Sequence, residues 1–128
     1  MKKHTLQVSM SKAYGDFFKD HQEWDFFLTM TPSLYRSQAA CRGLAQKVIT
    51  RLSAGAIWVT ERNPDKRGYH VHALLKTEHD IHEVQTVIRT ELKGMRHIVP
   101  YNREKGAAYY ITKDIFKNRV DWDIQENE

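Results

Sequence analysis

Three segments of the chain are short runs rich in apolar, aromatic and β-branched residues, and such runs predict β-strands. The segment WDFFLTMTP (24–32) is rich in aromatic and β-branched residues and ends at Pro32, which favours a buried strand. AIWVTER (56–62) and YHVHALLK (69–76) follow the same pattern. They are separated by NPDKRG (63–68), whose Asn-Pro, Asp and Gly are typical of a turn, so we expect a hairpin.

Other segments have the longer helical period. Apolar residues recur at helical spacing in 37–52, in 78–94, which ends at Gly94, and in 104–118. RHIVPYN (96–102) predicts a short strand, with Pro100 at its end or at a sheet edge. The predicted order is β-α-β-β-α-β-α. This order indicates an α+β sandwich in which a central, mainly antiparallel sheet is flanked by helices.

The length of the chain indicates a single domain, and its charge indicates a charged partner. The chain has 128 residues, enough for one domain with its own core. Residues 1–24 are an N-terminal extension without a clear role, and DWDIQENE (121–128) predicts an acidic tail with four acids and no base. Residues 1–120 hold 20 basic and 12 acidic side chains, a net charge of +8. This excess favours a phosphate-rich partner.

The cysteine content and the hydropathy of the chain indicate where in the cell the protein is expected. The single cysteine, Cys41, cannot form an internal disulfide, which favours a reducing compartment such as the cytoplasm. Cys41 lies in a helical apolar pattern, so we expect it to pack in the core rather than to act as a nucleophile. No apolar run reaches the roughly 18 residues of a membrane span, and no membrane partner is expected.

Two histidines in the segment 69–76 are the first candidates for chemistry. Alternation places His70 and His72 on one face of the strand, about 6.5–7 Å apart at Cα, so both imidazoles can reach one ion. Glu61 lies across the predicted turn and can reach the same point if the hairpin register allows. Two imidazoles and one carboxylate form a site for a catalytic divalent metal, whereas the alternative is a pair of half-exposed histidines.

The segment AAYYITKDIF supplies a second candidate. On a helix, Ala107, Ala108, Ile111 and Ile115 form one apolar face, and Tyr110 lies at its border. Lys113 and Lys117 follow Tyr110 by three and seven residues, on the same side. A nearby cation and a metal favour the phenolate form of a tyrosine. The alternative is that Tyr109 and Tyr110 only pack.

Together these residues resemble the HUH endonucleases, in particular the replication-initiator (Rep) domains of rolling-circle replication. Three motifs occur in the family's order: the strand FFLTMTP (26–32), H-hydrophobic-H after an upstream Glu in TERNPDKRGYHVHALL (60–75), and Tyr-x-x-Lys in YITKD (110–114). The resemblance spans residues 26–117. It implies an RRM-like, ferredoxin-like sandwich that nicks and joins single-stranded DNA at a replication origin, possibly in a hairpin.

The resemblance also implies roles for individual residues. Glu61, His70 and His72 would bind Mn²⁺ or Mg²⁺, Tyr110 would be the nucleophile, and Lys113 would assist it. Tyr109 is an alternative nucleophile, because some relatives use two tyrosines. Candidate DNA-binding residues are Thr29, Lys66, Arg67, Arg103, Lys105 and Lys117. The chain has no P-loop motif, so a helicase would be a separate partner.

Other classes of protein remain open on the sequence alone. A single-strand DNA transposase or a relaxase would share the chemistry, although relaxases usually carry a third histidine that we do not identify. A non-catalytic RRM-like module would offer stacking aromatics on its sheet face, where this chain offers histidines. A regulatory protein with a structural metal is a further alternative.

Overall fold

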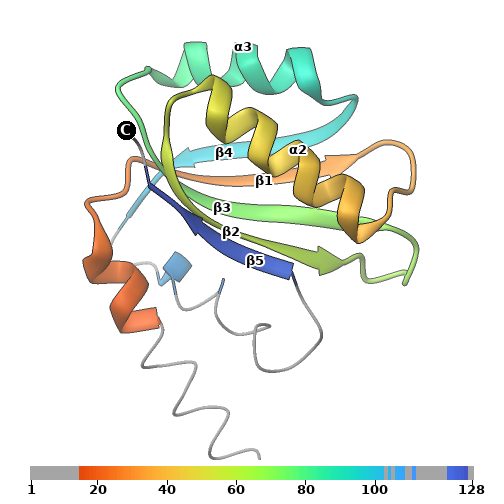
Figure 1. The fold of residues 1–128 in the computed structure, drawn as a ribbon, viewed down its shortest axis with the longest axis horizontal. Coiled ribbons are helices and arrows are strands. Elements are labelled where there is room, and N and C mark those ends of the chain that lie inside the picture. Colours follow the sequence, from red (N-terminus) through yellow and green to blue (C-terminus); the bar gives the residue numbers. More distant parts are fainter. Residues whose placement is uncertain (1–14, 103, 105, 109–110, 112–120, 127–128) are drawn as a thin grey trace, which may run out of the picture.

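A computed structural model describes residues 15–102, 104, 106–108, 111 and 121–126, which form a five-stranded sheet with helices on both faces (Figure 1). Residues 15–21 are helical. The elements that follow are β1 (Phe26–Pro32), α2 (Gln38–Arg51), β2 (Gly55–Arg62), β3 (Tyr69–Lys76), α3 (Ile81–Glu91), β4 (Gly94–Pro100) and β5 (Asp121–Gln125). The strand order is β4-β1-β3-β2-β5, and every pairing is antiparallel. The predicted α+β fold with an antiparallel sheet is confirmed.

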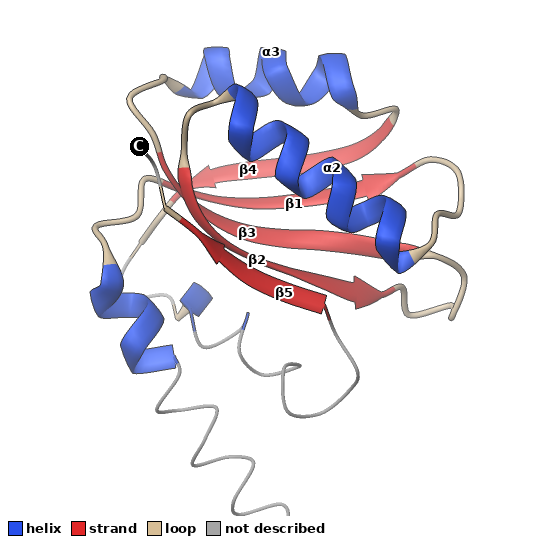
Figure 2. Ribbon diagram, viewed as in Figure 1, coloured by secondary structure: helices blue, strands red, loops and turns tan. Residues whose placement is uncertain are grey.

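α2 and α3 cover one face of the sheet (Figure 2). The main core lies between them and the strands, and it includes the inward-facing β3 residues Val71, Ala73 and Leu75, each no more than 1% exposed. Cys41 is buried in the same core, and burial raises the pKa of its thiol, so the predicted packing role is confirmed.

The opposite face carries a smaller apolar cluster. Leu74 of β3 and Ile57 of β2 contribute to it from the sheet, and Phe18, Ala108 and Ile111 are buried in it as well. Residues 107, 108 and 111 are helical, which agrees with the predicted helix over 104–118 where the structure describes it. The N-terminal extension therefore has a structural role from residue 15 onward, because its helix contributes Phe18 to this cluster.

Residues 121–125 of the predicted acidic tail belong to the sheet. These residues form β5, which pairs with β2 from Thr60↔Asp121 to Ala56↔Gln125. Trp122 and Ile124 pack against the smaller cluster. The segment DWDIQ alternates polar and apolar residues, and this period of two was the sequence signal for a strand. The acids conceal the signal because they lower the mean hydropathy.

Two turns use residues with positive φ. Gly94 opens β4 at φ +151, and a Cβ there would lie 2.2 Å from the Thr31 carbonyl oxygen and 2.5 Å from Ser33 N. Only glycine allows the start of β4 to approach β1 this closely. Gly68 closes the β2–β3 turn at φ +70, with the backbone of Tyr35 and Arg36 packed against it. None of the described helices is long and apolar enough to cross a bilayer.

Candidate metal centre

The hairpin register brings the three predicted ligands together. Glu61 of β2 pairs directly with His70 of β3, and His72 lies two residues further on the same face. The Nε2 atoms of His70 and His72 are 3.1 Å apart. The nearer Glu61 carboxylate oxygen lies 3.5 Å from Nε2 of His70 and 3.4 Å from Nε2 of His72. The predicted grouping of these side chains is confirmed as geometry.

The donor set fits a divalent cation. If each atom lies about 2.1 Å from a common centre, separations of 3.1–3.5 Å give ligand–metal–ligand angles of roughly 95–113°. The three side chains would supply three ligands to the ion and leave its other coordination positions to solvent or substrate, as in other two-histidine, one-carboxylate sites.

A second layer of residues fixes the orientation of both rings. Asn63 donates its side-chain N–H to the Arg67 carbonyl oxygen, so its amide oxygen faces Nδ1 of His70 at 2.8 Å and accepts from it. Nε2 of His70, which faces His72 and Glu61, then keeps its lone pair for a cation. Thr29 Oγ1 lies 2.9 Å from Nδ1 of His72 and can accept from it in the same way. Such partners orient ligands and make them more basic.

Asn63 was not predicted as a site residue, and Thr29 was predicted in a different role. The sequence pattern indicates only a turn at Asn63, because its contact with His70 depends on the bend of the hairpin. Thr29 was expected to bind DNA, whereas the structure pairs it with His72 on the adjacent strand. Phe27 also stacks on the His72 ring, with centroids 5.7 Å apart and planes at 21°.

The centre opens into a groove of about 540 Å³ at one end of the sheet. The groove is lined by the three ligands, by Thr29, Thr31 and Pro32 of β1, by Tyr35, and by Asn63, Pro64 and Asp65 of the hairpin turn. The His72 side chain is 8% exposed, and that of Glu61 is 23% exposed. Solvent and a ligand can therefore reach the triad through the carboxylate side.

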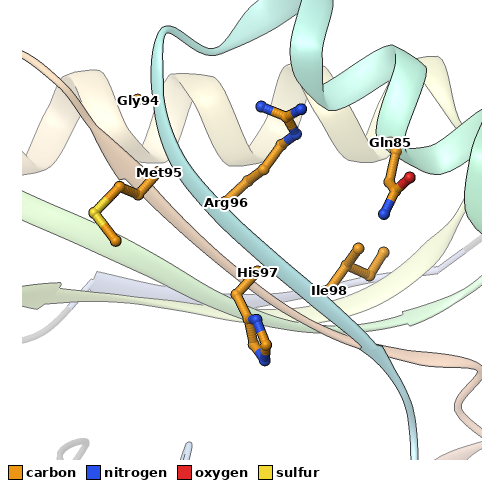
Figure 3. A pocket seen from close by; sticks show the side chains of 6 residues that line it. All are labelled: Gln85, Gly94, Met95, Arg96, His97 and Ile98. Carbon is orange, nitrogen blue, oxygen red and sulfur yellow. The ribbon is translucent and has the colours of Figure 1, made fainter.

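A third histidine, His97, shares this face but is not a ligand. It pairs with Thr29, which pairs with His72 across β1, so the three side chains form one row. Figure 3 shows His97 pointing away from α3, while Gln85 and Arg96 lie on the helix side of β4. Among the described residues, the ligand atoms that lie within 4.8 Å of one another belong to Glu61, His70 and His72, and His97 is not part of this group.

Other predicted site residues have different outcomes. Lys66 and Arg67 are exposed in the hairpin turn beside the groove, and Lys66 has φ +63. The remaining candidates lie outside the described residues: Arg103, Lys105, Tyr109, Tyr110, Lys113 and Lys117.

Comparison with protein-family models, curated proteins and solved structures found no match to this chain.

Proposed function

We propose that this protein is a metal-dependent HUH-type endonuclease that nicks and joins single-stranded DNA, as a rolling-circle Rep domain does. The observation that carries the proposal is the convergence of Glu61, His70 and His72 on one point in an accessible groove. When bound, a divalent ion supplies Lewis-acid polarisation of a phosphate oxygen. The excess of basic residues supports a polyanionic substrate.

The nucleophile in this proposal is Tyr110. Its neighbours Ala108 and Ile111 are each 1% exposed in the cluster that shares a sheet face with His72. Ala107 is partly buried there, so the predicted apolar helix face is confirmed for these three residues. Tyr110 borders that face in a helical projection, whereas Tyr109 projects about 100° away. This pattern and the Tyr-x-x-Lys spacing favour Tyr110.

The proposed reaction is a transesterification. The Tyr110 oxygen loses its proton and attacks phosphorus, so a phosphorus–tyrosine bond forms while the bond to the 3′ oxygen breaks. The 3′ oxygen leaves and takes up a proton, and the 5′ phosphate stays on the protein. Lys113, three residues after Tyr110 in the sequence, would offset the developing negative charge. A later 3′-hydroxyl can reverse the step and join two strands.

A denaturing gel tests the proposal. The full chain is incubated with a randomised single-stranded DNA pool and Mn²⁺, and a covalent adduct is expected as a slower protein band. Chelation, His70→Ala and Tyr110→Phe should each abolish the adduct. Tyr109→Phe is the matched control and should retain most of it, and mass spectrometry then locates the phosphotyrosine.

Three results would contradict parts of the proposal. Adduct formation by His70→Ala would contradict the role of His70 as a metal ligand in the reaction. An adduct on Tyr109 would reverse the choice of tyrosine. Tight binding to single strands without any adduct, across the pool, would favour the non-catalytic RRM-like module. A transposase or relaxase would form the same adduct, and these are distinguished by the captured DNA ends.

A further inference from the structure

Tyr35 is an exposed aromatic residue held in a fixed place beside the metal centre. It lies in the loop between β1 and α2 and lines the same groove as Glu61, His70 and His72. Its side chain is among the most exposed large apolar groups of the described residues, at 63%. A tyrosine in a ligand-lined groove with most of its surface in water is suited to contact a bound molecule.

The hairpin turn holds this loop in position. The backbone of Tyr35 passes so close to Gly68 that a Cβ there would lie 3.0 Å from the Tyr35 Cα. The Tyr35 hydroxyl donates to Asp65 at 3.5 Å, and Asp65 in turn accepts from the Arg67 backbone N–H at 2.9 Å. These contacts hold the backbone of the loop against the hairpin and restrict the ring, which lowers the entropic cost of stacking on it.

Charge around the ring indicates the kind of ligand. The Arg67 guanidinium lies 5.9 Å from the Tyr35 ring centroid, and Arg62 and Lys66 lie in the same hairpin. Of the acids in this hairpin, Glu61 faces the two histidines and Asp65 faces Tyr35. A flat aromatic surface next to a phosphate-binding cation is the arrangement by which proteins bind single-stranded nucleic acid without sequence preference.

We infer that Tyr35 is a base-stacking platform for the strand whose phosphate lies at the metal triad, with Arg67 contacting a phosphate of the stacked nucleotide. The inference rests on the proposed function for its substrate, single-stranded DNA. It adds a contact with a base to a site that otherwise contacts phosphate. It also assigns a role to the β1–α2 loop, which none of the sequence motifs includes.

The test separates contacts with bases from contacts with phosphates. Two probes of about 12 nucleotides, within the site size of single-strand binding folds, are used: oligothymidylate and an abasic phosphodiester of equal length. Affinities are measured by fluorescence anisotropy with a chelator present, so that no cleavage occurs. Tyr35→Ala should weaken oligothymidylate binding about fivefold or more and leave the abasic probe unchanged.

Two control variants make the result specific. Tyr35→Phe keeps the ring and loses the hydroxyl contact with Asp65, so it should lose less oligothymidylate binding than Tyr35→Ala does. Leu34→Ala removes the neighbouring side chain, which is 70% exposed and does not line the groove, and should also have no effect. Circular dichroism checks that each variant is folded.

The remaining outcomes each overturn one statement. Equal binding of oligothymidylate by Tyr35→Ala and the wild type overturns the stacking inference and leaves the proposed nuclease in place. An equal loss for both probes overturns it too, since the residue would then act through phosphate contacts. Failure of the wild type to bind either probe would overturn the proposed function itself.

Discussion

Thr29 and Thr31 lie on the same face of β1, but only Thr29 contacts a ligand of the candidate metal centre. Thr29→Val keeps the shape of the side chain and removes the oxygen that faces Nδ1 of His72. We expect Mn²⁺ affinity to fall about 10- to 100-fold, the usual effect of losing such a partner. Calorimetry measures the change.

Thr31→Val is the matched control for this experiment. It alters the same groove by the same atom, and it should bind Mn²⁺ as the wild type does. Equal affinities for the two variants would mean that the hydroxyl of Thr29 does not orient His72.

The donor set also predicts which ion binds more tightly. Two of the three ligand atoms are imidazole nitrogens, which suit Mn²⁺ better than Mg²⁺, an ion that prefers oxygen and retains its water. Titration of each ion at equal protein concentration should give the lower dissociation constant for Mn²⁺. Tighter Mg²⁺ binding would argue that at least one histidine is not a ligand.

At the scale of elements, Gly94 tests whether the start of β4 must lie close to β1, and Gly43, which has open space around it, is the control. Gly94→Ala would place a Cβ 2.2 Å from the Thr31 carbonyl oxygen, so we expect a loss of about 2–3 kcal/mol in the free energy of unfolding. Gly43 lies in the middle of α2 on its exposed side, and a Cβ there would have no other atom within 4 Å. Gly43→Ala should therefore stabilise the protein by up to about 1 kcal/mol.

Urea denaturation measures both glycine variants. If Gly94→Ala unfolds at the same urea concentration as the wild type, the start of β4 can move away from β1, and the close approach is not needed for stability.

Local chemistry made β3 predictable, because turn residues precede it and its first half alternates histidines with apolar residues. The helix predicted over 78–94 is shorter in the structure. Asp80 and Glu83 form a reciprocal cap that starts α3 at Ile81, and Gly94 belongs to a strand. The triad was predictable from spacing within one hairpin. The contact of Thr29 with His72 joins residues 43 apart, which no local pattern specifies.

At the scale of the whole molecule, β5 decides whether the C-terminal segment is structural. A chain ending at residue 120 loses Trp122 and Ile124 from the smaller cluster and leaves the outer edge of β2 uncovered. We expect a loss of about 3 kcal/mol or more in the free energy of unfolding, from the apolar area exposed. Urea denaturation of both chains measures it.

Asp123→Asn is the control for this truncation. It removes a charge and keeps the strand, so it should retain nearly the full stability. Unchanged stability of the truncated chain would show that the pairing of β5 contributes little to the fold.

The position of β5 also has a consequence for synthesis on the ribosome. β2 carries Glu61, and its residue Thr60 pairs with Asp121, which is translated 61 residues later. At roughly 5–20 residues per second, that interval lasts about 3–12 s. During this time the hairpin that holds Glu61, His70 and His72 can already form, while one side of β2 still presents unpaired backbone groups. A nascent chain of this protein can therefore hold the hairpin of its candidate metal centre for seconds while the adjacent sheet edge is open to other chains.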